Sequence, residues 1–356
     1  MPSSSELERI LESWLAARLP HAEELTVSGL RRPGAGASSE TQLFEIEWSE
    51  AGTPRRLGAV LRSTPEGPGV FPEYDLASQF RLLSALHGQP GVPVPEMLWL
   101  EEDPAVLGAP FYVMHQVEGE APTENPSTYH ATGLYRDATP ELRRGMWSDL
   151  LEALAALHEL DWRELGVDFV LGADADDDPL SAQLDYWTWF LESWIKDRPG
   201  ESYPVFEDAL AWLREHRYVP ERTALCWGDA KLGNALYQGP ERLTALLDWE
   251  LACIGDPELD LASLYVSDRR AWEGRGVPAL PGTPTAEELV EEYEARSGRT
   301  VRRFHYNEVF ATLWRGLAVL RIMKRMRAEG APIPEDRVYG GFAVERLQVL
   351  LDRAPR

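Results

Sequence analysis

Residues 225–250 read LCWGDAKLGNALYQGPERLTALLDWE, and no other stretch of the chain is as informative. Asp229, Lys231 and Asn234 fall within six residues, and a second carboxylate, Asp248, follows a short apolar run. A phosphoryl-transfer site needs a carboxylate to accept the proton of the attacking hydroxyl and a cation to offset charge on the moving phosphoryl group. An amide oxygen and a second carboxylate supply the oxygen ligands that Mg²⁺ prefers. The stretch therefore contains every group that such a site requires.

The segments around these side chains are predicted to be short buried strands. Residues 223–227 and 243–247 are apolar runs bounded by turn residues, which is typical of buried strands. The turn residues 238–242 precede the second run, so we expect the chain to fold back and bring Asp248 close to Asn234. The alternative is a surface loop that is merely rich in polar residues. Three ligand types at this spacing, followed by an aspartate at a strand end, favour the catalytic interpretation.

The motifs of this region also resemble those of a known family. Trp227-Gly228-Asp229 with Asn234, then Asp248-Trp249-Glu250, then Gly255–Ala262 (GDPELDLA) follow one another. They are similar to His-Gly-Asp-x-x-x-x-Asn, Asp-Trp-Glu and Gly-Asp-Pro-x-x-Asp-Leu-Ala of the aminoglycoside phosphotransferase and choline kinase-like superfamily. The resemblance is closest to the phosphotransferase branch that also occurs fused to acyl-CoA dehydrogenases. It extends over most of the chain and is strongest between 223 and 265.

The main departure from the family pattern is Trp227, which stands where the family usually has a histidine. In related kinases that histidine braces the catalytic loop, so we expect the indole to serve as a packing substitute. The resemblance implies an α+β, protein-kinase-like fold with two lobes. Residues 1–117 would form a small antiparallel sheet with a leading helix that binds the nucleotide. Residues 118–356 would form a larger, mostly helical lobe with the catalytic and acceptor sites.

The N-terminal region is predicted to be a helix followed by strands. Residues 4–18 place apolar side chains on one helical face, and residues 24–63 contain segments with strand-like alternation. A turn of small residues between the first two strands lets backbone N–H groups approach phosphates. In front of the 225–250 block this turn is expected to cover the nucleotide, although an ordinary hairpin turn has the same composition. The residues concerned are Gly34, Gly36, Ser38 and Ser39.

A cation for the upstream phosphates is expected at Arg62, the end of the third predicted strand. Kinases place a lysine there, and the branch named above tends to carry arginine, whose planar fork suits phosphate. The alternative is an arginine that only extends its charge to solvent at a strand end. The family commonly pairs this cation with a glutamate of the next helix, here residues 74–86, where the aligned position holds Gln79. The apolar face of that helix is predicted to comprise Leu76, Phe80, Leu83 and Leu86.

Two further strands, residues 92–100 and 109–115, are predicted to complete the first lobe. In this fold the backbone of the following hinge binds the adenine edge. The predicted hinge residues are Met114, His115, Gln116 and Val117. Since backbone groups make these contacts, side-chain identity is not diagnostic there, and His115 is interpreted as a strand residue.

The remainder of the chain is predicted to be mainly helical. The pattern indicates helices over residues 141–160 and 307–327, and His158 in the first of them is interpreted as a structural core histidine. The aromatic-rich residues 182–217 are expected to be core, with some rings available to an acceptor pocket. Asp256 is expected to cap the start of a helix, and Asp260 is expected to anchor the catalytic loop through its backbone.

Composition and charge agree with a soluble cytoplasmic enzyme. The chain has 356 residues, of which 44% are hydrophobic and 26% charged, so two lobes with their own cores are expected. No apolar run is long enough to cross a bilayer, and the N-terminus lacks a basic region followed by an apolar one. The formal net charge of −24 argues against a nucleic-acid partner, because phosphate backbones need clustered lysine and arginine. Attraction of a cationic substrate would account for the acidity, but solubility is the favoured explanation, because the acidic residues occur in separate short groups along the chain.

Cysteine and histidine usage argues against a disulfide or a zinc site. The two cysteines, Cys226 and Cys253, lie in apolar surroundings without Cys-x-x-Cys spacing and are interpreted as small buried side chains. The seven histidines are scattered without a metal-binding motif. No sequence feature specifies an oligomeric state.

Three functions are compatible with these features. The favoured one is an ATP- and Mg²⁺-dependent kinase for a hydroxyl group of a small molecule, with GTP as an alternative donor. Asp229 would be the base, Lys231 would stabilise the transferring phosphoryl group, and Asn234 and Asp248 would bind Mg²⁺. The second is a nucleotide-binding pseudokinase or regulator. The third is a non-catalytic binder of a hydrophobic metabolite. Aminoglycosides, amino alcohols, macrolides, sugars and hydroxy acids all remain candidate acceptors.

Overall fold

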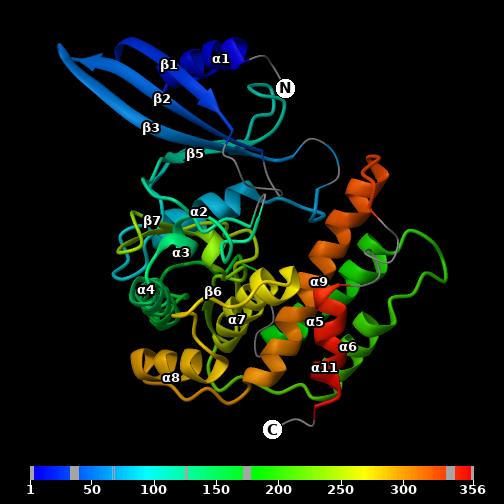
Figure 1. Ribbon diagram of the computed structural model, residues 1–356. Helices are drawn as coiled ribbons and strands as arrows, with labels where there is room; N and C mark the ends of the chain where they lie inside the picture. The colour runs from blue at the N-terminus through cyan, green and yellow to red at the C-terminus, as the bar shows by residue number, and fades with distance from the viewer. Residues whose placement is uncertain are drawn as a thin grey trace. The chain divides into compact units, whose positions relative to one another are not determined.

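The computed structural model describes residues 4–32, 40–65, 67, 69–124, 127–170, 178–333 and 341–353. The chain divides into two compact units, one of residues 1–87 with 94–118 and one of residues 88–93 with 119–356. The first contains an antiparallel sheet, and the second is mostly helical (Figure 1). The predicted α+β class is confirmed.

The first unit is a five-stranded sheet with two helices. The strands lie in the order β1-β2-β3-β5-β4, and every neighbouring pair is antiparallel. Leu7, Leu11 and Trp14 of α1 pack with Phe44 and Ile46 of β2 in one apolar core, which explains the predicted one-sided pattern of the leading helix. The elements are α1 (Ser4–Ala16), β1 (Glu23–Arg31), β2 (Glu40–Glu50), β3 (Thr53–Ser63), α2 (Leu76–Leu86), β4 (Met97–Glu101) and β5 (Phe111–His115).

Two predictions for this unit are wrong in detail. The strand expected over 92–100 begins only at Met97, because Pro93 and Pro95 have no N–H to donate to a neighbouring strand. The buried face of α2 includes Gln79 and Leu82, whereas Phe80 is only partly buried.

The second unit contains two short antiparallel strand pairs among helices. Strand β6 pairs with β9, and β7 pairs with β8, both antiparallel. Its helices are α3 (Leu134–Asp137), α4 (Pro140–Glu159), α5 (Pro179–Trp189), α6 (Pro204–Glu215), α7 (Glu258–Trp272), α8 (Ala286–Ser297), α9 (Phe304–Ala328) and α11 (Phe342–Leu351), with a π-helical turn at Phe190–Ile195 and 3₁₀ turns at Leu232–Asn234 and Glu273–Arg275. Its strands are β6 (Ala224–Cys226), β7 (Ala235–Tyr237), β8 (Leu243–Leu246) and β9 (Cys253–Gly255).

Helix α9 is the structural centre of this unit. It packs against α6, α7 and α11, which lie around it in Figure 1. Nearly every residue from Tyr306 to Leu320 is buried, as expected for a helix that is enclosed on all sides. Among the helices of the described residues, none combines the length and apolar character that crossing a bilayer requires.

Candidate active site

The 225–250 block contains the strand pair β7–β8, which brings its polar side chains together, and most of β6, which pairs with β9 beyond the block. Asn234 ends a 3₁₀ turn directly before β7, and β7 pairs with β8. The backbone N–H of Leu247 donates to the carbonyl of Asn234 at 2.8 Å. Because Asp248 follows Leu247, its backbone lies close to that of Asn234 on the facing segment. The predicted reversal of the chain is confirmed.

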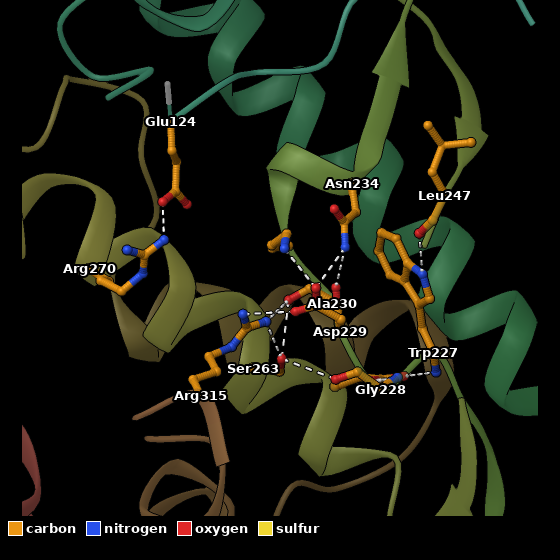
Figure 2. A network of polar contacts seen from close by, with 12 residues as sticks. Glu124, Trp227, Gly228, Asp229, Ala230, Asn234, Leu247, Ser263, Arg270 and Arg315 are labelled. Carbon is orange, nitrogen blue, oxygen red and sulfur yellow. Dashed lines mark hydrogen bonds and ion pairs between the residues drawn. The ribbon is translucent and has the colours of Figure 1, made fainter. Parts of the chain in front are cut away.

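Asp229 is surrounded by donors, of which Figure 2 labels Asn234 and Arg315. Lys231 Nζ lies 2.7 Å from Asp229 Oδ2, and Asn234 Nδ2 donates to the same oxygen at 2.9 Å. Asn234 Nδ2 also donates to the Asp229 carbonyl at 3.1 Å. On the other side, Arg315 Nη1 lies 2.8 Å from Asp229 Oδ1. Three of the four predicted catalytic and metal-binding side chains are therefore in direct contact.

The charge state of Asp229 follows from these neighbours. Burial raises its pKa, but the positive charges of Lys231 and Arg315 and the hydrogen bonds from Lys231 and Asn234 outweigh that effect. The net result is a pKa below the usual value for aspartate, so Asp229 is ionised at neutral pH. An ionised carboxylate is the form that can accept a proton.

Asp260 anchors the catalytic loop, as predicted. Its buried carboxylate accepts the backbone N–H of Trp227 at 2.6 Å and that of Gly228 at 2.8 Å. His158 Nε2 lies 3.1 Å from Asp260 Oδ2, and His158 Nδ1 lies 2.8 Å from the hydroxyl of Tyr293. The interpretation of His158 as a structural core residue is confirmed, because both ring nitrogens are engaged inside the protein. The two residues before Asp229 are thereby fixed from α7 and α4.

Trp227 does more than fill space in this loop. Its ring is fully buried, and its indole N–H donates to the carbonyl of Leu247 at 2.8 Å (Figure 2). The tryptophan at the position of the family histidine therefore supplies a hydrogen bond from the catalytic loop to the residue before Asp248. Gly228 has φ of +84°, and a Cβ there would lie 1.9 Å from the Leu251 carbonyl oxygen. Only glycine fits at this position.

Asp248 occupies an unusual backbone conformation. Its φ is +62°, one of three positive values among the described non-glycine residues. Such a conformation is unfavourable for an L-residue and persists where the surroundings enforce it, often at functional sites. The side chain is only partly buried, and so is accessible to a ligand.

The donor chemistry of Asn234 and Asp248 fits Mg²⁺. Asn234 uses Nδ2 for both bonds to Asp229, which leaves the amide oxygen Oδ1 as its ligand atom. An amide oxygen and a carboxylate are hard ligands of the kind that Mg²⁺ prefers. A second group of potential ligands, His158, Cys226 and Asp260, lies within the core. Its histidine nitrogens and carboxylate oxygens already serve the hydrogen bonds described above, so this group is structural.

The residues predicted for the nucleotide belong to the first unit. Arg62 is buried near the end of β3, opposite Tyr112 in the β3–β5 ladder, and the Tyr112 hydroxyl lies 3.5 Å from Gln79 Oε1. Met114 and His115 end β5, and the N–H groups of His115 and Gln116 donate to the Glu96 and Gly58 carbonyls. Val117 follows directly. The predicted turn residues Gly34, Gly36, Ser38 and Ser39 lie outside the described residues.

Two residues of the site, Arg315 and Ser263, were not assigned to the catalytic loop from the sequence, although the helix over residues 307–327 that contains Arg315 was predicted. Arg315 Nη2 donates to the Ala230 carbonyl at 2.9 Å and contacts Ser263 Oγ at 2.6 Å. Ser263 Oγ in turn lies 3.2 Å from the Ala230 carbonyl oxygen. A signal for Arg315 was present, because it is the only charged residue between Glu308 and Arg321. A charge inside an otherwise apolar helix is normally buried with a partner.

The cysteines are closer to each other than their sequence separation suggested. Cys226 and Cys253 are direct partners in the β6–β9 ladder, yet both are free thiols and both are buried. The contact with Cys253 and, after it, burial raise the pKa of the Cys226 thiol well above its usual value. A protonated, buried thiol is unreactive, as the interpretation of small core side chains requires.

Comparison with known proteins identifies the family of the chain. Residues 30–309 match the model of the phosphotransferase enzyme family. Acyl-CoA dehydrogenase family member 10 of Mus musculus is 30% identical over 252 residues, which are 66% of this chain and 21% of the mouse protein. The chain thus matches only about a fifth of that relative's length.

Solved structures show the same fold. A Ralstonia eutropha protein assigned to the aminoglycoside phosphotransferases has a TM-score of 0.66 at 23% identity, over 97% of this chain and 95% of that one. A thermostable mutant of aminoglycoside phosphotransferase APH(4)-Ia, in a ternary complex with ADP and hygromycin B, has a TM-score of 0.53 at 17% identity, over 96% and 97% of the two chains. The predicted kinase-like fold is confirmed, and the chain belongs to the phosphotransferase enzyme family.

Proposed function

We propose that this protein is a kinase that transfers the γ-phosphoryl group of ATP to a hydroxyl group of a small molecule in the presence of Mg²⁺. The observation that carries the proposal is the contact of Asp229 with Lys231 and Asn234, beside Asp248 on the adjoining strand end. A protein that only binds a nucleotide has no need of a base, a phosphoryl-directed cation and a pair of oxygen ligands together. The ADP complex of the APH(4)-Ia mutant is consistent with an adenine nucleotide.

Asp229 and Lys231 perform the chemistry in this proposal. Asp229 Oδ2 accepts the proton of the acceptor hydroxyl while the hydroxyl oxygen forms a bond to the γ-phosphorus. The bond between the γ-phosphorus and the β–γ bridging oxygen breaks, and ADP leaves with the electron pair. Lys231, whose side chain is 26% exposed, turns from Asp229 to the oxygens of the moving phosphoryl group.

Asn234 Oδ1 and the Asp248 carboxylate would hold Mg²⁺. When bound, Mg²⁺ would neutralise charge on the nucleotide phosphates and orient them. Removing one such ligand typically costs several kcal/mol of transition-state stabilisation.

Residues 1–117 would bind the nucleotide, and residues 118–356 would carry the catalytic and acceptor-binding sites. Arg62 would hold the upstream phosphates, and Gly34, Gly36, Ser38 and Ser39 would cover them. Since the N–H groups of His115 and Gln116 already donate within the sheet, the adenine edge would bind other backbone groups of residues 114–117. GTP is the alternative donor, and competition between ATP and GTP tests this choice.

We further propose that the protein acts in the cytoplasm on a small molecule, without a nucleic-acid or membrane partner. The net charge of −24 opposes binding to nucleic acid. Two free thiols placed opposite each other on paired strands suit a reducing compartment. Hygromycin B in the APH(4)-Ia complex is an example of a hydroxylated ligand in this fold.

A nucleotide-binding regulator is the second candidate, and Gln79 is the observation that favours it. Gln79 is buried at the position where kinases place a glutamate, so the ion pair that orients the phosphate-binding cation is absent between these two side chains. Such a protein would bind Mg-ATP without turning it over.

The deciding experiment measures ADP release from Mg-ATP with a panel of hydroxylated small molecules, for the wild type and for Asp229→Asn and Asp248→Ala. Asp268→Asn is the matched control, because it removes a buried carboxylate of the same unit whose hydrogen bonds involve Tyr129, His130 and Trp272. Acceptor-dependent turnover that both site variants lose and the control keeps would support the kinase. Nucleotide binding without turnover would favour the regulator, and an absence of nucleotide binding would refute the site.

A further inference from the structure

Arg315 reaches the catalytic loop from the middle of α9 and contacts Asp229, Ala230 and Ser263 at once (Figure 2). Nη1 lies 2.8 Å from Asp229 Oδ1, and Nη2 donates to the Ala230 carbonyl at 2.9 Å and contacts Ser263 Oγ at 2.6 Å. Only 10% of the side chain is exposed. A planar guanidinium can make such a set of contacts, whereas an ammonium group cannot reach them together.

The two cations on Asp229 differ in how firmly they are held. Lys231 belongs to the same loop as Asp229, contacts the other oxygen, Oδ2, and is more exposed than Arg315. Arg315 is fixed by a long buried helix and by Ser263 of α7. When Lys231 turns to the phosphoryl group, Arg315 remains as the cation that faces the carboxylate.

The contacts of Arg315 also fix the backbone on both sides of Asp229. Ser263 Oγ lies 3.4 Å from the Gly228 carbonyl oxygen and 3.2 Å from the Ala230 carbonyl oxygen. Arg315 therefore joins the loop residues 228–230 to both α7 and α9. Loss of the guanidinium would leave Asp229 Oδ1 buried without its cation and the Ala230 carbonyl without this donor.

We propose that Arg315 is a positioning residue of the phosphoryl-transfer site. It holds the Asp229 carboxylate with Oδ1 turned inward, so that Oδ2 faces the acceptor hydroxyl, and it does not itself bind nucleotide or acceptor. This inference rests on the proposed kinase function for its kinetic part. Correct placement of a reacting group accounts for large rate factors, so a small rotation of the carboxylate lowers turnover without changing nucleotide affinity.

The test compares Arg315→Ala and Arg315→Lys with Arg346→Ala. Arg346 is an equally buried arginine on α11 that pairs with Glu308 of α9, so its removal controls for the loss of a buried ion pair at the same helix. Turnover is measured as Mg-ATP hydrolysis with water as the acceptor, and nucleotide affinity is measured by calorimetry. Both readouts avoid the need for an identified acceptor.

We expect kcat to fall about tenfold or more in Arg315→Ala, with the Kd for Mg-ATP within about twofold of the wild type. Millimolar guanidinium should restore part of the lost kcat, because it can occupy the vacated position. Arg346→Ala should keep its kcat. A raised Kd with unchanged kcat would make Arg315 a nucleotide-binding residue, and equal losses in both alanine variants would reduce its role to general packing. Either result would overturn the proposal.

Arg315→Lys keeps the inference testable if Arg315→Ala does not fold. Lysine retains the charge but cannot contact Asp229, Ala230 and Ser263 together, so kcat should still fall, and a wild-type kcat would contradict the proposal. Hydrogen exchange of residues 225–236 gives a readout that needs no nucleotide. Exchange should accelerate in the Arg315 variants and not in Arg346→Ala, and unchanged exchange would overturn the inference. If the wild type turns over Mg-ATP neither with water nor with any acceptor of the panel, the kinase proposal fails while the exchange result still decides the role of Arg315.

Discussion

Replacement of Asp260 by asparagine tests whether this side chain of α7 anchors the catalytic loop in addition to stabilising the fold. The Asp260 side chain is fully buried, and Oδ2 faces both the Trp227 N–H at 2.6 Å and His158 Nε2 at 3.1 Å. Oδ1 accepts the Gly228 N–H at 2.8 Å. Asparagine has the same shape but a single acceptor oxygen.

The expected loss of stability can be worked out from these three contacts. The amide oxygen of asparagine is best placed at the Oδ2 position, where it serves two donors, so its NH₂ group then faces the Gly228 N–H. Two buried donors, the Gly228 N–H and the asparagine N–H that faces it, are left unsatisfied at a cost of about 1–3 kcal/mol each, and the two remaining bonds lose the strength that a charged acceptor gives, about 1 kcal/mol each. The sum, about 4–8 kcal/mol, begins within the range of about 3–5 kcal/mol for breaking a buried charged network and extends above it.

The measurement is urea unfolding followed by fluorescence of the 13 tryptophans, together with acceptor-dependent ADP release at a temperature where the variant is folded. We expect kcat to fall as well, because Trp227 and Gly228 directly precede Asp229. Asp268→Asn is the control, since that carboxylate lies on the same helix and contacts side-chain donors from Tyr129 and His130. It should lose stability but keep its kcat. A loss below about 1 kcal/mol in Asp260→Asn, or equal loss of kcat in the control, would refute the reasoning.

Three further predictions follow from the same region. Burial raises the pKa of Glu258 from 4.5 to about 7. Between pH 4.5 and about pH 7 the folded protein therefore keeps a proton that the unfolded chain has released. The free energy of unfolding should fall by up to about 3 kcal/mol as the pH rises through this range. Urea titrations of Glu258→Gln should lack this part of the pH dependence, and an unchanged dependence would contradict it. Gly228→Ala should lower the free energy of unfolding by about 2–5 kcal/mol and abolish turnover, because the added Cβ would overlap the Leu251 carbonyl and φ at this position is left-handed. A stable, active variant would show that the loop can move. Trp227→Phe removes the donor to the Leu247 carbonyl and should cost about 1–3 kcal/mol in urea unfolding, whereas an unchanged unfolding midpoint would mean that water replaces the indole.

The sequence alone determined the features that depend on residues close together in the chain. Asp229, Lys231 and Asn234 lie within six residues, and their spacing was sufficient to predict that these three side chains meet. The predicted chain reversal also brings the backbone of Asp248 next to Asn234. The periodic apolar patterns gave the strands of the first unit and helices such as α4 and α9 to within a few residues, because burial on one face imposes a period on the sequence. Proline was the local exception, and the strand predicted from residue 92 starts only at Met97.

Only the tertiary structure decided which distant residues complete the site. Arg315 lies 86 positions beyond Asp229 and His158 lies 71 before it, yet both act on the same loop, Arg315 directly and His158 through Asp260. The same holds for Cys226 and Cys253, which are partners across β6 and β9 although no spacing motif links them. A side-chain period shows which face of an element is buried, but not what packs against it. Those contacts are set when the helices pack. For this reason the family motif predicted the anchoring role of Asp260, but only the tertiary structure showed that Arg315 contacts Asp229 and that His158 contacts Asp260.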